Sequence, residues 1–275
     1  MSTTANAAKL VEYKKEGGIA VLTLNDPPAN TYTHEMMKDL DECIIKARFD
    51  AEVHVIVITG AGEKFFCAGA NINMLQTVDP YFKYFFCLHA NETLIRLEQT
   101  PKLVIAAING HCVGGGLEIA MAADLRIARR GAGKTGLPEV TLGVLPGTGG
   151  TQRLARLVGK SKAIELMVTG ETFDFERALD LGMITSIHDD KAEKDGKTTS
   201  FMDHVMEYAA QFCPPNKAAK AVGNIKRAVQ SGAEVPFSES LAIERELQQL
   251  LFQSEDAKEG LTAYVEKRKP IFKAK

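Results

Sequence analysis

Two glutamates in this chain lie beside clusters of glycine, a combination that could bind a substrate and transfer protons. Glu118 follows the glycine run 114–116, and Glu139 precedes further glycines within 147–150. Because glycine has no Cβ, a ligand oxygen can approach the backbone N–H groups of such clusters closely. If the two carboxylates converge, one could take a proton from water while the other supplies a proton to a substrate. Two solvated surface glutamates are the alternative interpretation.

The glycine run 114–116 lies where an expected strand meets an expected helix. Residues 103–108 form an apolar, β-branched-rich run typical of a buried strand, and residues 117–123 have the alanine content and periodicity of a helix. The N–H groups that a helix N-terminus leaves free carry a partial positive charge, so the junction could bind negative charge. Alternatively, the glycines permit close helix packing, and Glu118 complements the helix dipole.

The chain must fold back between the two glutamates if their side chains are to lie close together. Glu118 and Glu139 are 21 positions apart, and residues 124–128 between them have the pattern of a strand. Alternation of strands and helices favours an α/β fold with parallel strands. The remaining elements predicted in this part are strands at 19–24 and 53–59 and an amphipathic helix at 34–48.

After residue 159 the strand signals fade and helical patterns dominate. Helices are predicted at 160–168, 174–182, 201–213, 216–230, 236–253 and 255–268. The polar composition of residues 188–200 favours an exposed linker. We therefore predict a core spanning 1–200 and a helical region spanning 201–275, which packs on the core or on another subunit.

Composition excludes several classes of partner. The 33 basic and 35 acidic residues nearly balance, so bulk charge predicts no nucleic acid or anionic membrane partner. The six histidines show no paired ligand spacing, so no metal site is expected. Five cysteines without a C-x-x-C pair favour reduced thiols, and the N-terminus lacks the features of a secretory or mitochondrial leader. A cytoplasmic location is expected, with no membrane-spanning segment.

Four segments, taken together and in order, resemble the enoyl-CoA hydratase/isomerase family, the crotonases. They are FFCAGANINML (65–75), INGHCVGGGLEIAMAADLRIA (108–128), GLPEVTLGVLPGTGGTQRLARLVG (136–159) and EGLTAYVEKRKPIF (259–272). The resemblance implies an α/β fold, the crotonase (ClpP-like) spiral of ββα-type repeats. It also implies that the C-terminal helices serve oligomerisation and CoA closure, in a homotrimer or a dimer of trimers.

The resemblance assigns roles to five residues at the expected site. The backbone N–H groups of Ala70 and Gly115 would form an oxyanion hole for the thioester oxygen. Glu118 would activate water as a base, and Glu139 would protonate the α-carbon. Gly147 would help position the catalytic water.

A CoA site follows from the same resemblance. Lys64 would lie near the phosphates, and the Ala68 carbonyl would contact the adenine. Tyr264 and Lys267 would reach CoA from the helical region, often that of a neighbouring subunit. No cofactor beyond the CoA moiety of the substrate, and no metal, is implied. The full set of substrate-binding residues is Lys64, Ala68, Gly69, Ala70, Ile72, Gly114, Gly115, Tyr264 and Lys267.

This sequence departs from the family pattern near the expected site. Asn71 replaces the usual aspartate and can still cap the following helix. Asn73 occupies a position where some members have a CoA-binding lysine, and the loop 129–135 is about one residue longer than usual, with Thr135 where phenylalanine is common. Five aromatic residues within 80–86 lie in a region that commonly contributes to acyl specificity. Either one or two of them narrow the acyl pocket, or they pack in the core.

Both glutamates of hydratase members are present, so the resemblance favours reversible syn addition of water to a 2-enoyl-CoA, which gives a 3-hydroxyacyl-CoA. An enoyl-CoA isomerase, an acyl-CoA hydrolase or a specialised acyl-CoA dehydratase on the same fold is the alternative. Some relatives of this fold bind RNA. The lysine-rich stretch 217–227 would allow such binding, although its helical spacing favours a solvated face.

Overall fold

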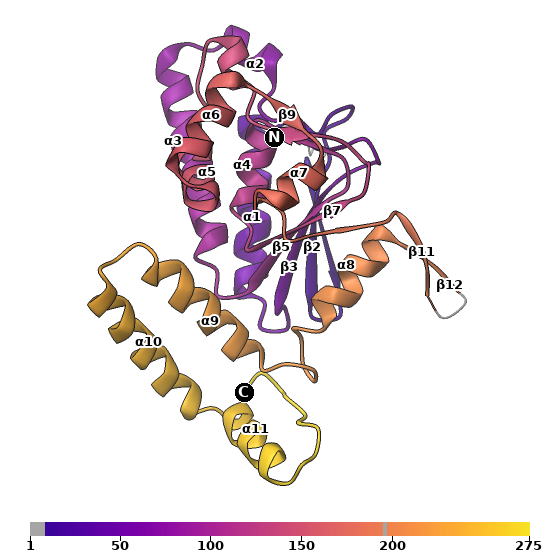
Figure 1. Ribbon diagram of the computed structural model, residues 1–275, viewed down its shortest axis with the longest axis vertical. Helices are drawn as coiled ribbons and strands as arrows, with labels where there is room; N and C mark the ends of the chain where they lie inside the picture. Colours follow the sequence, from indigo (N-terminus) through magenta and orange to yellow (C-terminus); the bar gives the residue numbers. More distant parts are fainter. Residues whose placement is uncertain (1–8, 195–196) are drawn as a thin grey trace, which may run out of the picture.

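A twisted sheet forms the centre of the protein (Figure 1). The computed structural model describes residues 9–194 and 197–275, and in them the main sheet has six strands in the order β1-β2-β3-β5-β7-β10. β1 is antiparallel to β2, and every other pair is parallel. The strands are β1 Val11–Glu16, β2 Ile19–Leu24, β3 Val55–Gly60, β5 Leu103–Ile108, β7 Leu125–Arg129 and β10 Ser186–His188.

Helices cover both faces of this sheet, which explains why its central strands are apolar throughout. Alternate residues of a strand point to opposite faces. Ile56 and Ile58 pack with α1 (His34–Phe49) and α3 (Pro80–Glu98). Val55 and Val57, which alternate with these isoleucines along β3, pack with α8 (Phe201–Ala210) on the other face. The predicted parallel α/β arrangement is confirmed.

Short strands form a second, four-stranded sheet in the described residues, with the order β4-β6-β8-β9. The members are β4 Phe65–Cys67, β6 His111–Val113, β8 Thr135–Gly136 and β9 Thr172–Phe173. β4, β6 and β8 each follow a long strand of the main sheet and each precede a helical element. The expected ββα-type repeat is therefore present, although the short strands themselves were not predicted.

The helical elements that follow the short strands border the site. They are α2 Ile72–Thr77, α4 Gly115–Met121, the 3-10 turn η1 Glu139–Leu142, α5 Gly150–Val158, α6 Lys160–Thr169 and α7 Phe175–Asp180. α4 begins two residues before the predicted helix 117–123, because Gly114 turns the chain with φ of +54° directly before it. Gly115 is therefore the first residue of α4.

The predicted linker 188–200 was wrong in part, because residues within it form a hairpin. β11 (Lys191–Lys194) pairs antiparallel with β12 (Lys197–Ser200), and α8 begins directly afterwards with a capping box between Ser200 and Asp203. The boundary near residue 200 stays a prediction, and α8 beyond it packs on the main sheet.

Three helices extend from the core as a separate group in Figure 1, namely α9 Ala219–Gly232, α10 Phe237–Phe252 and α11 Glu255–Val265. A buried lysine connects this group to the sheet. Lys226 on α9 is 8% exposed, and its Nζ lies 2.9 Å from Oδ2 of Asp124 and donates to the Lys102 carbonyl. The lysine-rich stretch 217–227 is therefore not wholly a solvated face.

None of the helices in the described residues is both long and apolar enough to cross a membrane.

Candidate active site

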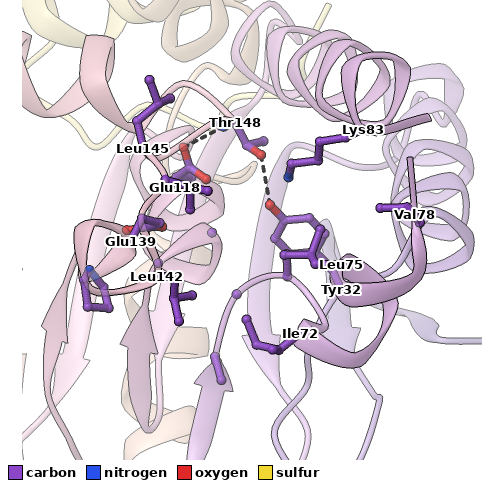
Figure 2. A pocket seen from close by; sticks show the side chains of 18 of the residues that line it. Tyr32, Ile72, Leu75, Val78, Lys83, Glu118, Glu139, Leu142, Leu145 and Thr148 are labelled. Carbon is purple, nitrogen blue, oxygen red and sulfur yellow. Dashed lines mark hydrogen bonds between the residues drawn. The ribbon is translucent and has the colours of Figure 1, made fainter. Parts of the chain in front are cut away.

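A cavity of about 420 Å³ opens between the second sheet, α2, the start of α3 and the chain that leads into α5 (Figure 2). Three carboxylate residues, Asp79, Glu118 and Glu139, and one lysine lie on its wall, which is otherwise largely apolar. Its lining residues are Tyr32, Ala68, Gly69, Ala70, Ile72, Leu75, Val78, Asp79, Pro80, Lys83, Gly114, Gly115, Glu118, Pro138, Glu139, Leu142, Val144, Leu145, Gly147 and Thr148.

Glu118 is fixed by the loop that precedes α5. The residue lies on α4 and is 2% exposed. Its Oε1 accepts hydrogen bonds from the backbone N–H groups of Thr148 and Gly150, both at 2.7 Å. Burial raises the pKa of Glu118, and these two N–H donors oppose the rise because they stabilise the ionised form. The carboxylate is thus buried, oriented and supplied with donors.

Glu139 begins η1 and has a different environment. Its Oε2 is buried and has no hydrogen-bond partner among the described residues. Burial, with a smaller contribution from the charge of Glu118, raises the pKa of Glu139 to about 7. A carboxyl group with this pKa is partly protonated near neutral pH, so it could donate a proton.

The backbones of two glycines approach each other beside these carboxylates. Gly69 has φ of +90°, and a Cβ on it would lie 2.9 Å from the backbone nitrogen of Gly115. Gly115 begins α4, where the first N–H groups of a helix have no intrahelical partner. In the described residues, neither the Gly115 N–H nor the Ala70 N–H donates to a backbone carbonyl of a turn or loop. Two N–H groups in this cavity can therefore bind a ligand oxygen.

Tyr32 is a site residue that sequence reasoning missed. Its ring packs against Gly115, where a Cβ would lie 2.3 Å from Cε1 of the ring. Its hydroxyl lies 2.9 Å from Oγ1 of Thr148, the residue whose N–H holds Glu118. Nothing near Tyr32 in the sequence could have revealed the contact, because Thr148 is 116 residues away.

The comparisons with known proteins decide the family. Residues 14–275 match the sequence model of the family described as Enoyl-CoA hydratase/isomerase. The chain belongs to this family. A probable enoyl-CoA hydratase of Bacillus subtilis (strain 168) is 40% identical over 256 residues, which cover 93% of this chain and 95% of that protein.

Further relatives of the same family match the chain over similar lengths. A short-chain-enoyl-CoA hydratase of Clostridium acetobutylicum is 38% identical over 257 residues, which cover 93% of this chain and 94% of that protein. The crystal structure of an enoyl-CoA hydratase from Geobacillus kaustophilus HTA426 has a TM-score of 0.91 at 44% identity, and the match covers 98% of each chain. This protein is accordingly an enzyme with the crotonase fold.

The resemblance to this enoyl-CoA hydratase/isomerase family implied a set of site residues. Most of them lie together around the cavity. Those that line it are Ala68, Gly69, Ala70, Ile72, Gly114, Gly115, Glu118, Glu139 and Gly147. Lys64, Tyr264 and Lys267 do not line it. Tyr264 is 86% exposed near the end of α11, and Lys267 follows that helix. Lys64 directly precedes β4.

The departures from the family pattern have structural outcomes. Asn71 caps α2 as expected, because its Oδ1 accepts from the Met74 N–H at 3.1 Å. The expectation that aromatic residues of 80–86 narrow the acyl pocket is not met, since none of them lines the cavity. Phe86 is buried and stacks on Tyr32 at 5.6 Å between ring centroids, while Tyr81 is 75% exposed. The segment contributes Pro80 and Lys83 to the cavity instead.

No cluster of three or more histidine, cysteine, aspartate or glutamate side chains suited to a metal ion occurs in residues 9–194 and 197–275.

Proposed function

We propose that this enzyme catalyses the reversible syn addition of water to a 2-enoyl-CoA thioester, which gives a 3-hydroxyacyl-CoA. The observation that supports this proposal is the convergence of Glu118 and Glu139, held in different ways, on one cavity. Beside them are two N–H groups suited to a thioester oxygen. The substrate is an acyl-CoA, and no metal or further cofactor takes part.

In the proposed reaction the thioester oxygen binds between the N–H groups of Ala70 and Gly115. Glu118 takes a proton from water as the oxygen of that water bonds to C3. The electrons of the double bond move toward the thioester oxygen, and Glu139 gives its proton to C2. Removing one donor of such an oxyanion hole costs about 2.7–4 kcal/mol of transition-state stabilisation. Proton exchange afterwards returns Glu118 to its ionised form and Glu139 to its protonated form.

The different environments of the carboxyl groups support this division of roles. The base must be ionised before the reaction, and the Glu118 carboxylate accepts two N–H groups at 2.7 Å. The acid must be protonated, and the pKa of Glu139 is about 7. Gly147 lies in the loop that leads to the donors of Glu118, where it can help position the water.

We place CoA along Ala68, Gly69, Ile72 and Gly114, all of which line the cavity. Lys64, Tyr264 and Lys267 lie outside it, and we propose that Tyr264 and Lys267 act on the CoA of a neighbouring subunit in a trimer or a dimer of trimers. A cytoplasmic location is proposed from the cysteines, all five of which lie in the described residues as free thiols.

The variants Glu118→Gln and Glu139→Gln test the proposal. With crotonyl-CoA and longer 2-enoyl-CoA thioesters, wild-type enzyme should consume the enoyl absorbance and form 3-hydroxyacyl-CoA. Each variant should lower turnover by roughly 10²–10⁴, because each removes one proton-transfer group. Glu35→Gln, at an exposed position of α1, is the matched control and should retain wild-type turnover.

Product analysis separates the alternatives in the same assay. An isomerase would move the double bond without adding water, and a hydrolase would release free CoA. Failure to hydrate any thioester of the panel, or wild-type rates in both glutamine variants, would overturn the proposed function.

A further inference from the structure

A lysine faces the cavity from the wall opposite the two glutamates. Lys83 lies in the first turns of α3, is half-buried and points into the cavity in Figure 2. Leu75 and Val78 lie on the same side, and Leu142 lies near Glu139. The surface between the carboxylates and the ammonium group is therefore mainly apolar.

The Lys83 ammonium has no anionic partner in the described part of the chain. Among residues 9–194 and 197–275, no hydrogen bond or ion pair involves its Nζ, which lies 5.2 Å from the centroid of the Phe86 ring. Asp79 is the acidic residue on the same wall, and its Oδ1 already accepts from the Phe82 N–H at 2.7 Å as the cap of α3. The charge of Lys83 acts on Glu139 across the cavity, where it opposes the rise of that pKa.

A substrate that fills the cavity displaces water from this ammonium group. An apolar acyl chain would offer nothing in exchange, and desolvating an unpaired charge is unfavourable. An acyl chain with an anionic end would supply a charge-assisted hydrogen bond instead. The arrangement thus discriminates between acyl chains by their distal end, in addition to their length.

We propose that Lys83 binds a carboxylate at the far end of the acyl group, so that the preferred substrate is the CoA monothioester of an unsaturated dicarboxylic acid. This inference rests on the proposed function, because Ala70, Gly115 and the two glutamates locate the thioester and the double bond. The apolar residues would contact the methylene groups between the double bond and the distal carboxylate.

Two matched substrates test the inference. The monothioester of hex-2-enedioic acid and hex-2-enoyl-CoA have the same chain length and differ in whether C6 is a carboxylate or a methyl group. Wild-type enzyme should have the higher kcat/KM for the dicarboxylic thioester. In Lys83→Met, the ratio of the two kcat/KM values should fall about tenfold to hundredfold, as expected when a hydrogen bond between charged groups is lost.

Lys38→Met is the control, because Lys38 is exposed on α1 and does not line the cavity. The ratio should not change in this variant. An equal loss on both substrates in Lys83→Met would place the lysine on the shared CoA moiety and overturn the inference. An unchanged ratio would overturn it as well.

Binding of unreactive analogues separates this inference from the proposed function. Calorimetry with adipoyl-CoA and hexanoyl-CoA requires no turnover. Lys83→Met should raise the Kd of adipoyl-CoA about tenfold to hundredfold more than that of hexanoyl-CoA. This result without any hydration would contradict the proposed reaction and uphold the role of Lys83. Hydration without any difference in binding would contradict the role of Lys83 alone.

Discussion

At the scale of single residues, Glu118 and Glu139 show how surroundings assign different chemistry to the same side chain. Glu118 is nearly fully buried, yet two backbone N–H groups stabilise its charge. Glu139 has a buried oxygen without a partner in the described residues, and its pKa is raised to about 7. Two carboxyl groups with pKa values set by different environments are suited to act as an acid and a base.

The raised pKa of Glu139 predicts a pH-dependent stability difference between wild type and Glu139→Gln. The pKa rises from an ordinary value of 4.5 to about 7 on folding, so the folded state binds this proton more tightly than the unfolded state. The associated stability is present below pH 4.5 and is lost as the pH rises through about 7. Glutamine does not titrate. The Tm of the variant relative to wild type should therefore be higher at pH 8.5 than at pH 4.5.

Thermal unfolding of both proteins at the two pH values measures this difference. Other titrating groups contribute to both proteins and cancel in the comparison. A Tm difference that stays constant with pH would show that Glu139 titrates near its ordinary value.

At the scale of elements, the sequence predicted the long strands, which are apolar runs. It missed the short strands, whose position depends on pairing with residues far away in the sequence. β5 is buried on both faces, and β2 is buried on one face and half-buried on the other, so their apolar composition alone identified them. β8 has two residues, and its place is set by pairing of Gly136 with Val113 and Thr172. Two residues carry no periodicity, so such a strand becomes recognisable only in the folded protein.

The candidate site was likewise predicted only in part. Glycine clusters indicated Glu118 and Glu139, and the family resemblance supplied their roles. Tyr32, just before α1, and Lys83, on α3, line the cavity because of how these segments pack. No local sequence pattern predicts this packing. Tyr264 and Lys267 lie outside the cavity of their own chain, so their predicted contact with CoA stays a prediction.

The packing of α4 against β4 predicts that Gly116→Ala damages both stability and turnover. A Cβ at Gly116 would lie 2.0 Å from the backbone carbonyl oxygen of Cys67, so the start of α4 must move. Overpacking of this kind typically costs about 1–3 kcal/mol. The shift would displace both Gly115 and Glu118, so turnover should fall as well.

Gly260→Ala is the matched control for this prediction. Gly260 lies inside α11, and a Cβ there would meet only the Phe272 ring, at 3.5 Å. Alanine is favoured over glycine inside a helix by about 0.5–1 kcal/mol, so this variant should be slightly more stable. Urea unfolding and turnover assays of both variants provide the comparison. Equal stability of the two, with normal turnover, would contradict the close contact of α4 and β4.

At the scale of the whole molecule, the C-terminal helices expose many large apolar side chains. Exposed apolar surface of this extent is typical of protein interfaces. It agrees with the proposed assembly, in which Tyr264 and Lys267 reach a neighbour. The exposed residues on α9, α10 and α11 are Ile225, Val229, Phe237, Leu241, Leu250, Phe252, Leu261, Tyr264 and Val265.

Mixed oligomers test whether Lys267 serves a neighbouring subunit. Lys267→Ala should raise KM for 2-enoyl-CoA about tenfold, because a hydrogen bond to a charged group of CoA is lost. Glu118→Gln alone should be nearly inactive. When both variants are co-expressed, Glu118 of one chain and Lys267 of the other should complete some sites, and activity with the wild-type KM should reappear. If Lys267 acts within its own chain, no site of the mixture has both residues and only the raised KM will be measured.

The buried contact between Lys226 and Asp124 bears on how variants found by genetic selection should be interpreted. Lys226 belongs to the helices that we assign to assembly, whereas Asp124 lies three residues after α4, which carries Glu118. Loss of the lysine would leave the half-buried Asp124 carboxylate without its cation, and with only the Val104 N–H as a donor to its Oδ2. A selection for inactive enzyme would therefore recover Lys226 variants together with active-site variants. If such variants were grouped by their distance from Glu118 along the sequence, Lys226 variants would be assigned wrongly to a defect unrelated to the active site.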